Sequence, residues 1–217
     1  MNHDDSEEAR LRADEHMSGT EAYYERGAER WAKTKTDSFF HEDEFRHFLS
    51  TVSSRDAKVV DLGCAGGLHV PLFLGMGREL HYTGVDLSQA FLEIARRRYP
   101  QLTFYQGDLT ESDSLPKQSF DAFWCAATFM HIPKVFMPLA AKNIGSICRP
   151  GAIGYFTLPK THPSGDLAKD DPRHFEIMSP EEQRQLIAGF GWKIRYETEK
   201  GGFHSPGVWQ AYLVELP

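Results

Sequence analysis

Residues 59–67 read Val-Val-Asp-Leu-Gly-Cys-Ala-Gly-Gly, an apolar run that ends in a turn of small residues. The apolar run begins at Ala57, so we expect a strand over 57–62 and a helix over 68–76, with Pro71 in its first turn. Glycines between a strand and a helix let backbone amides approach a ligand at the amino end of that helix. The stretch predicts a strand-to-helix unit of an α/β sheet with a ligand at its turn.

This turn does not fit two common phosphate-binding patterns. The dinucleotide fingerprint G-x-G-x-x-G requires small residues at 63, 65 and 68, but position 68 is Leu. A phosphate-binding P-loop requires Gly-Lys-Ser/Thr after the turn, and that sequence is absent. Asp61 would repel a pyrophosphate, whereas it suits a ligand with an ammonium group. Taken alone, the stretch also fits a turn that binds nothing.

Strands and helices alternate on the C-terminal side of this turn, which is typical of a parallel sheet covered on both faces. Two helix starts are well marked, with Ser88 as an N-cap and Ser179 with Glu182 as a capping box. The last two strands are joined by residues 200–207, too short for a helix, so they are expected to form an antiparallel hairpin. The expected strands lie over 81–87, 102–109, 120–127, 152–158, 192–199 and 208–216, and the expected helices over 88–99, 134–148 and 179–190.

Acidic residues follow two further strands, at the sheet edge where open α/β folds bind ligands. Asp86 lies 19 residues after Gly67, where a carboxylate can accept from both hydroxyls of a ribose. Its alternative role is helix capping, for which Ser88 is better suited. Asp108 can accept from the exocyclic amine of adenine, or it can simply form a Gly-Asp turn.

Taken together, these residues resemble the class I S-adenosylmethionine-dependent methyltransferases of the small-molecule type. The segments DLGCAGG, VDLS, QGDL and FDAFWCAATFMHIP resemble four successive motifs of that family, and the likeness runs from about Val59 through Ile153. The resemblance implies a Rossmann-like, seven-stranded, mostly parallel sheet with an antiparallel final strand and helices on both faces. Ala65 stands where the family usually has glycine, and its methyl group can be accommodated if φ is negative there.

The resemblance also implies S-adenosyl-L-methionine as the cofactor. Asp61, Gly63 and Gly67 would face its methionine part, Asp86 its ribose and Asp108 its adenine. The full set of expected cofactor-binding residues is Asp61, Gly63, Cys64, Ala65, Gly67, Asp86, Leu87, Ser88, Gly107, Asp108, Leu109 and Cys125.

His131, which follows the fourth strand, is the candidate for a general base or a substrate-orienting group. A base of this kind contributes about 10²–10⁴-fold to rate. A packing or helix-starting histidine is the alternative. The expected substrate-binding residues come from the N-terminal helix, this strand end, an insertion over 159–178 and the hairpin tip, and they are Tyr23, Tyr24, Trp31, His131, Arg173, His174 and Phe203. The alternatives for these are packing at the sheet edge and a salt-bridged surface loop.

A small molecule is the expected substrate, and no nucleic acid is expected. The net charge of −7 argues against binding through phosphate neutralisation, and Arg96–Arg98 end a helix where cations favour the dipole. Residues 125–128 lack the Asp/Asn-Pro-Pro-aromatic motif of adenine amino-methylating enzymes, and Cys125 fits a packed thiol rather than a nucleophile. Two alternatives from other classes stay open: a non-catalytic nucleoside-binding module and a nicotinamide oxidoreductase.

The 217 residues divide into an acidic, mobile terminus (1–18), a helical cap (19–55) and a methyltransferase domain (56–217) with a substrate loop near 159–178. Within the cap, helices are expected over 20–35 and 39–52. We expect a cytoplasmic monomer or homodimer, because the chain start lacks an apolar signal segment and no run is long enough to span a membrane. The three cysteines predict no disulfide framework, and His162, His174 and His204 lack the spacing of metal ligands.

Overall fold

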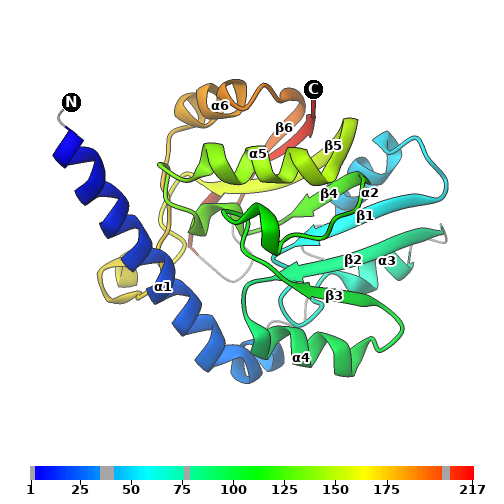
Figure 1. The fold of residues 1–217 in the computed structure, drawn as a ribbon, viewed down its shortest axis with the longest axis horizontal. Coiled ribbons are helices and arrows are strands. Elements are labelled where there is room, and N and C mark those ends of the chain that lie inside the picture. Colours follow the sequence, from blue (N-terminus) through cyan, green and yellow to red (C-terminus); the bar gives the residue numbers. More distant parts are fainter. Residues whose placement is uncertain (1–2, 35–41, 76–78, 202–205) are drawn as a thin grey trace.

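A computed structural model describes residues 3–34, 42–75, 79–201 and 206–217, which form a seven-stranded sheet of order β3-β2-β1-β4-β5-β7-β6 (Figure 1). Every neighbouring pair is parallel except the two pairs that β7 makes, with β5 and with β6. The predicted fold class and the terminal hairpin are therefore confirmed. The strands are β1 (Ala57–Leu62), β2 (Leu80–Asp86), β3 (Thr103–Gln106), β4 (Phe120–Cys125), β5 (Cys148–Pro159), β6 (Lys193–Gly201) and β7 (Val208–Glu215).

The helices begin where the sequence provides caps. Ser88 accepts a hydrogen bond from the backbone of Phe91, and Ser179 forms the expected capping box with Glu182. Pro71 lies in the first turn of its helix, where its missing N–H removes no intrahelical bond. The helices are α1 (His3–Thr34), α2 (Glu42–Thr51), α3 (Val70–Gly75), α4 (Gln89–Arg98), α5 (Met137–Ile147) and α6 (Pro180–Gly189), with short 3₁₀ turns η2 (Ser112–Ser114), η3 (Phe129–His131) and η4 (Gly165–Asp170).

Alternating strand residues fill two cores, one on each face of the sheet. Val60 and Phe123 belong to the core covered by α5 and α6, whereas Val59 and Trp124 belong to the core covered by α2, α3 and α4. All four side chains are fully buried. The two apolar faces explain why helices lie on both sides of the sheet in Figure 1.

The N-terminal helix is longer than the sequence predicted. The apolar stripe predicted a helix from Thr20, but α1 begins at His3 and runs unbroken across residue 18. Residues 3–18 contain no Gly or Pro and are rich in Glu, Ala and Arg, so helix propensity continues where the apolar stripe is absent. The predicted helix start at Thr20 is therefore wrong, whereas the division at residue 18 and the mobility of the segment before it stay predictions.

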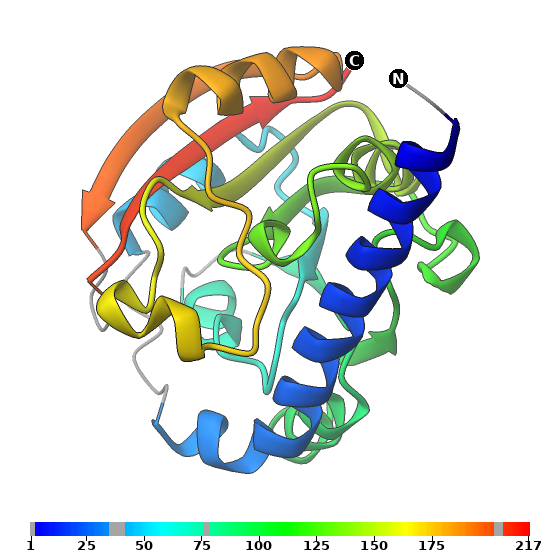
Figure 2. The same ribbon diagram turned by 90° about the vertical axis from the view of Figure 1, so that its left-hand side faces the viewer.

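The second half of α1 lies along one side of the molecule and packs against α4 (Figure 2). Ala28 and Ala32 of α1 are buried against Phe91 and Ile94 of α4. The small alanine side chains allow this close approach. As a result, α1 lies beside the carboxyl ends of the first strands, the edge at which a ligand was predicted.

Candidate functional site

A cavity of about 970 Å³ opens at the carboxyl ends of the parallel strands. Most of its wall comes from the segments that follow β1, β2, β3 and β4, the inner side of α1, and the insertion over 159–178. Thr157, Pro206 and Trp209 complete it. Binding sites for small molecules usually measure about 300–1,000 Å³, so this cavity has room for a nucleoside cofactor and a second small molecule.

The turn after β1 presents backbone to the cavity through residues of left-handed conformation. Gly63 and Gly67 each have φ of +77°, a conformation that favours glycine. A Cβ atom on Gly63 would collide with the side chain of Thr128, and one on Gly67 would lie 2.7 Å from the Tyr99 ring. The glycines are therefore required by both conformation and space.

Ala65 departs from the expected conformation. Its φ is +48°, so the condition of a negative φ, under which an alanine was expected to fit at this position, is not met. The Ala65 N–H donates to Asp86 Oδ2 at 2.8 Å, and this bond helps to hold the turn in place. The methyl group is 8% exposed, so the site accepts it at the conformational cost of a left-handed alanine.

Asp86 organises the cofactor side of the cavity. Its Oδ1 accepts from the Ser88 N–H at 2.9 Å, while Oδ2 is bonded to Ala65. Each carboxylate oxygen has a second acceptor site, which leaves both oxygens able to accept from a ligand hydroxyl. Burial raises the pKa of Asp86 to about 6, although these backbone bonds act in the opposite direction.

Asp61 lies below the cavity wall rather than in it. Its carboxylate is fully buried and accepts a hydrogen bond from the Tyr82 hydroxyl at 2.9 Å. The other oxygen, Oδ1, has no hydrogen-bond partner among the residues that the structure describes. Burial raises the pKa of Asp61 to about 7. His69, whose Nδ1 lies 4.0 Å from Asp61 Oδ2, is itself part of the wall.

Asp108 forms the local turn that was its alternative role, and its acceptance from an adenine amine stays a prediction. Asp108 lines the cavity, and its Oδ1 accepts from the backbone N–H and the hydroxyl of Thr110, each at 2.7 Å. One carboxylate oxygen thus closes a local turn.

Eight of the residues predicted to bind the cofactor line the cavity, namely Gly63, Ala65, Asp86, Leu87, Ser88, Gly107, Asp108 and Leu109. Four do not: Asp61, Cys64, Gly67 and Cys125. Cys64 and Cys125 are buried in the two cores on opposite faces of the sheet, and burial raises the pKa of both thiols. Cys125 is the last residue of β4 and Cys64 lies in the turn after β1, and each thiol packs in a core rather than facing the cavity.

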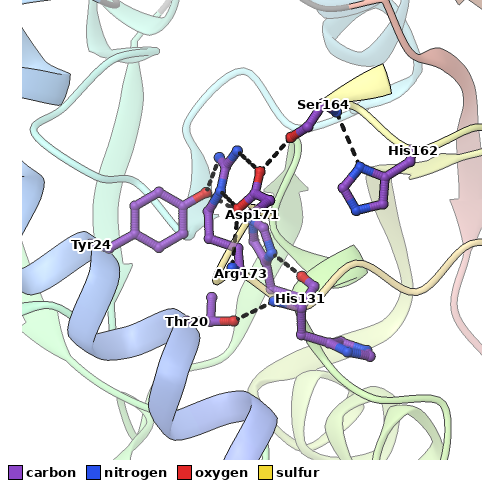
Figure 3. Close-up of polar contacts among 8 residues, drawn as sticks. Thr20, Tyr24, His131, His162, Ser164, Asp171 and Arg173 are labelled. Carbon is purple, nitrogen blue, oxygen red and sulfur yellow. Dashed lines mark hydrogen bonds and ion pairs between the residues drawn. The ribbon is translucent and has the colours of Figure 1, made fainter. Parts of the chain in front are cut away.

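His131 stands across the cavity at the end of η3 with both ring nitrogens bonded (Figure 3). Nδ1 lies 2.7 Å from the carbonyl oxygen of His174, which can only accept, so Nδ1 carries the proton. Nε2 lies 2.9 Å from the Tyr24 hydroxyl and accepts from it. Burial lowers the pKa of His131 to about 4, so the imidazole is neutral at physiological pH.

Arg173 joins α1 to the insertion. Its Nη1 donates to the Tyr24 hydroxyl oxygen at 3.2 Å, while Nε and Nη2 donate to the two oxygens of Asp171 at 2.9 and 2.6 Å. The guanidinium carbon lies 5.0 Å from the centre of the Tyr23 ring and 4.8 Å from that of Phe175. The guanidinium is therefore enclosed by aromatic rings and paired with a carboxylate.

Five of the residues predicted to bind the substrate line the cavity, namely Tyr23, Tyr24, Trp31, His131 and Arg173, and their binding role stays a prediction. The ring of His174 is not in the wall: its Nε2 lies 3.3 Å from Glu176 Oε2, and its backbone N–H donates to Thr20 Oγ1 at 2.8 Å. Phe203 lies outside the described residues, so its role stays a prediction.

The sequence reasoning missed two residues that hold the site together. Asp171 lies two places before Arg173, and that spacing was the only signal available. Glu25 of α1 accepts from the Ser88 hydroxyl at 2.6 Å and lies 3.2 Å from the backbone nitrogen of Ala90, so it caps α4 from another helix. No local pattern marks Glu25, because its partners lie more than 60 residues away in the sequence.

The strand order, the reversed β7 and the acidic residues at successive strand ends define a Rossmann-like, nucleoside-binding methyltransferase fold. A family profile described as "Methyltransferase domain" matches residues 59–151. Residues 59–151 thus match a methyltransferase domain, and these similarities support a class I S-adenosylmethionine-dependent methyltransferase with S-adenosylmethionine as its cofactor.

Three similar proteins illustrate this relationship. The chain is 29% identical over 132 residues to a trans-aconitate 2-methyltransferase of Azoarcus sp. strain BH72, covering 58% of this chain and 50% of the relative. It is 30% identical to a ubiquinone biosynthesis O-methyltransferase of Alkalilimnicola ehrlichii, covering 60% of this chain and 50% of the relative. The chain thus spans about half the length of these curated relatives. A magnesium protoporphyrin IX methyltransferase from Synechocystis PCC 6803, solved with bound S-adenosylmethionine, shares the fold with a TM-score of 0.71 at 14% identity, covering 93% of this chain and 97% of that chain.

The observed geometry fits this cofactor. Gly63 and Ala65, with no side chain and a single methyl group, leave room for a ligand beside the turn after β1, and Asp86 keeps acceptor sites free for ribose hydroxyls. The unpartnered Oδ1 of Asp61 supplies negative charge beneath this turn, on the side predicted to face the methionine ammonium. The part of the chain that the structure describes contains no cluster of three His, Cys, Asp or Glu residues that could hold a metal, and no helix able to cross a membrane.

Proposed function

We propose that this chain transfers the methyl group of S-adenosylmethionine to an oxygen or nitrogen atom of a small molecule. The observation that carries the proposal is a single cavity whose wall contains both the cofactor-binding turn and the hydrogen-bonded pair Tyr24–His131. The bound cofactor supplies an electrophilic methyl group on a sulfonium. The chain must place the acceptor atom in line with it, and such positioning contributes up to about 7–11 kcal/mol.

In this proposal the part of the cavity formed by the segments after β1, β2 and β3, the cofactor half, binds S-adenosylmethionine. Asp86 accepts from the ribose hydroxyls and Asp108 from the adenine amine, with Leu87 and Leu109 beside them in the wall. The charge of Asp61 favours the ammonium of the methionine part from beneath the turn. Helix α1 serves as a cover, because it supplies one side of the cavity, whereas α2 packs against a face of the sheet.

His131 is the proposed proton acceptor. The bond from Nδ1 to the His174 carbonyl fixes the ring and leaves Nε2 as the basic nitrogen. Nε2 now accepts from Tyr24, so an acceptor hydroxyl either replaces the Tyr24 hydroxyl there or donates to it. Either arrangement gives the proton of the acceptor a path to Nε2.

The low pKa of His131 favours one alternative, a nucleoside-binding module without turnover, because a weakly basic imidazole is a poor proton acceptor. Calorimetric titration with S-adenosylmethionine and with its demethylated product tests cofactor binding, and formation of that product with pools of hydroxyl and amine metabolites tests turnover. Binding with turnover supports the proposal. Binding without turnover favours the module, and absence of binding rejects both.

Asp113→Ala provides a matched control for the acidic residues of the site. Asp113 is fully exposed, lies on η2 outside the cavity wall, and pairs with Lys117 only at the surface. The variant removes one carboxylate and should leave both cofactor affinity and turnover unchanged. Loss of affinity in this control would mean that general charge, rather than Asp86, governs cofactor binding.

A further inference from the structure

The part of the cavity that is walled by α1 and the insertion over 159–178, here called the acceptor side, contains an ion pair whose two charges neutralise each other. Asp171 and Arg173 share two hydrogen bonds in a fork, and the Ser164 hydroxyl donates to Asp171 as a third partner (Figure 3). The side chains are only 8% and 20% exposed, respectively. Bidentate pairs of this kind are the strongest that arginine makes with a carboxylate.

This pairing uses the charge that would otherwise attract an anionic ligand. Among the described residues that line the cavity, Arg30 and Arg173 are the two cations, and Arg30 lies on the exposed side of α1. Five wall residues are carboxylates, namely Glu21, Asp86, Asp108, Asp170 and Asp171. An anion that approached Arg173 would have to displace Asp171, whose pKa is held below its ordinary value because hydrogen bonds from Arg173 and Ser164 outweigh the effect of burial.

The same arrangement also disfavours a cationic ligand. Rings of Tyr23, Tyr24 and Phe175 could form a box for an ammonium group, since aromatic faces attract cations. Here the guanidinium of Arg173 already lies 4.8–5.8 Å from the centres of these three rings. A second cation would be repelled by the charge of Arg173, and both carboxylate oxygens of Asp171 already accept hydrogen bonds from Arg173.

On the basis of the proposed function, we propose that Asp171 determines substrate specificity by neutralising the charge of Arg173. The acceptor molecule is then uncharged in the part that lies beside Tyr24 and His131. Specificity of this kind works by making the wrong ligand unfavourable rather than by improving the right one. Trans-aconitate, which appears in the names of several relatives, carries three carboxylates and is therefore disfavoured as a substrate of this chain.

The test compares two probes of one shape, benzamide and benzoate, on protein saturated with the demethylated cofactor. The wild-type protein should bind benzamide more tightly than benzoate. Asp171→Asn, which frees the charge of Arg173, should shift the affinity ratio toward benzoate by about tenfold or more, and the double variant with Arg173→Gln should lose that gain. Asp170→Asn removes the same charge from the same wall without breaking the fork, so its ratio should stay at the wild-type value.

Three results would overturn the inference: equal binding of both probes by wild type, equal shifts in the Asp171 and Asp170 variants, or failure of Asp171→Asn to bind benzoate. Arg173→Gln gives a second, reciprocal readout if Asp171→Asn does not fold. It leaves Asp171 without its partner and should favour cationic benzamidine over benzamide, and an unchanged ratio would also overturn the inference. The probe ratios do not depend on turnover, so a failure here is distinct from a failure of methyl transfer.

Discussion

The two halves of the cavity are built in different ways. On the cofactor side the wall follows the backbone turns after β1, β2 and β3, with Gly63 and Ala65 in left-handed conformations and their turn tied to Asp86. On the acceptor side the wall is made of side chains from α1 and the insertion, and Tyr24 and Arg173 meet across 149 positions of sequence. Backbone geometry suits a ligand common to a whole family, whereas distant side chains can change individually. The structure thus separates a constant binding task from a variable one.

The largest expected effect tests the acceptor half. His131→Asn retains a side chain that can contact Tyr24 but removes the basic nitrogen. Turnover should fall by about 10²–10⁴-fold, the usual contribution of a general base, while calorimetric affinity for the demethylated cofactor stays unchanged. If turnover is retained, His131 is a packing residue and the acceptor half has no base.

Asp86→Asn is the corresponding test of the cofactor half. Asn keeps one carbonyl oxygen for the turn and loses the charge that strengthens hydrogen bonds from the ribose. Hydrogen bonds to charged groups contribute about 1.5–3 kcal/mol each, so affinity for S-adenosylmethionine should fall by roughly 100-fold in calorimetry. The hydrogen bonds of the Asp86 side chain go to the backbone of Ala65 and Ser88 and not to Tyr24, His131 or Arg173, so the benzamide-to-benzoate ratio should not change. Undiminished cofactor affinity would contradict the ribose assignment.

A third prediction concerns Asp61 and pH. Its folded pKa of about 7 lies above the ordinary value of 3.8, so the folded state holds a proton that the unfolded state has released between these values. The free energy of unfolding of the ligand-free protein should therefore decrease as pH rises from 4 to 7. Asp61→Asn should remove this part of the decrease, on the order of 2 kcal/mol, as seen by urea unfolding at pH 5 and pH 8. Parallel pH curves for both proteins would show that Asp61 is ionised without cost.

The smallest expected effect compares one alanine from each half. Ala65 and Ala127 have φ of +48° and +55°, a conformation that costs alanine about 1–2 kcal/mol but is open to glycine. Ala65→Gly and Ala127→Gly should each stabilise the protein by up to about 1 kcal/mol, because the greater freedom of glycine in the unfolded chain offsets part of the gain. Ala141→Gly in the middle of α5 is the control and should destabilise by about 1 kcal/mol. A loss of stability in both left-handed variants would mean that the alanine methyl groups have a packing role.

The difference between the halves also explains what could be predicted from sequence. The strands, the hairpin and the cofactor-side residues followed from local signals, because a strand, its turn and the acid at its end are adjacent in the chain. His131 was found for the same reason. The contact of Arg173 with Tyr24 and the capping of α4 by Glu25 depend on how distant segments meet. The fork between Asp171 and Arg173 is local and agrees with the salt-bridged alternative, but its place in the cavity wall could not be predicted. The left-handed φ of Ala65 was missed because glycine is the usual signal for that conformation.

The contacts of Glu25 provide a way to couple the binding of the cofactor to the binding of the acceptor. Helix α1 is bonded to the cofactor side through Glu25 with Ser88, and to the acceptor side through Thr20 with His174 and Tyr24 with Arg173. Helix α1 is thus in contact with both the cofactor side and the acceptor side of the cavity. Wherever the cofactor alters the position of α1, it alters the affinity for the acceptor, and thermodynamic reciprocity requires that the acceptor change the affinity for the cofactor by the same factor.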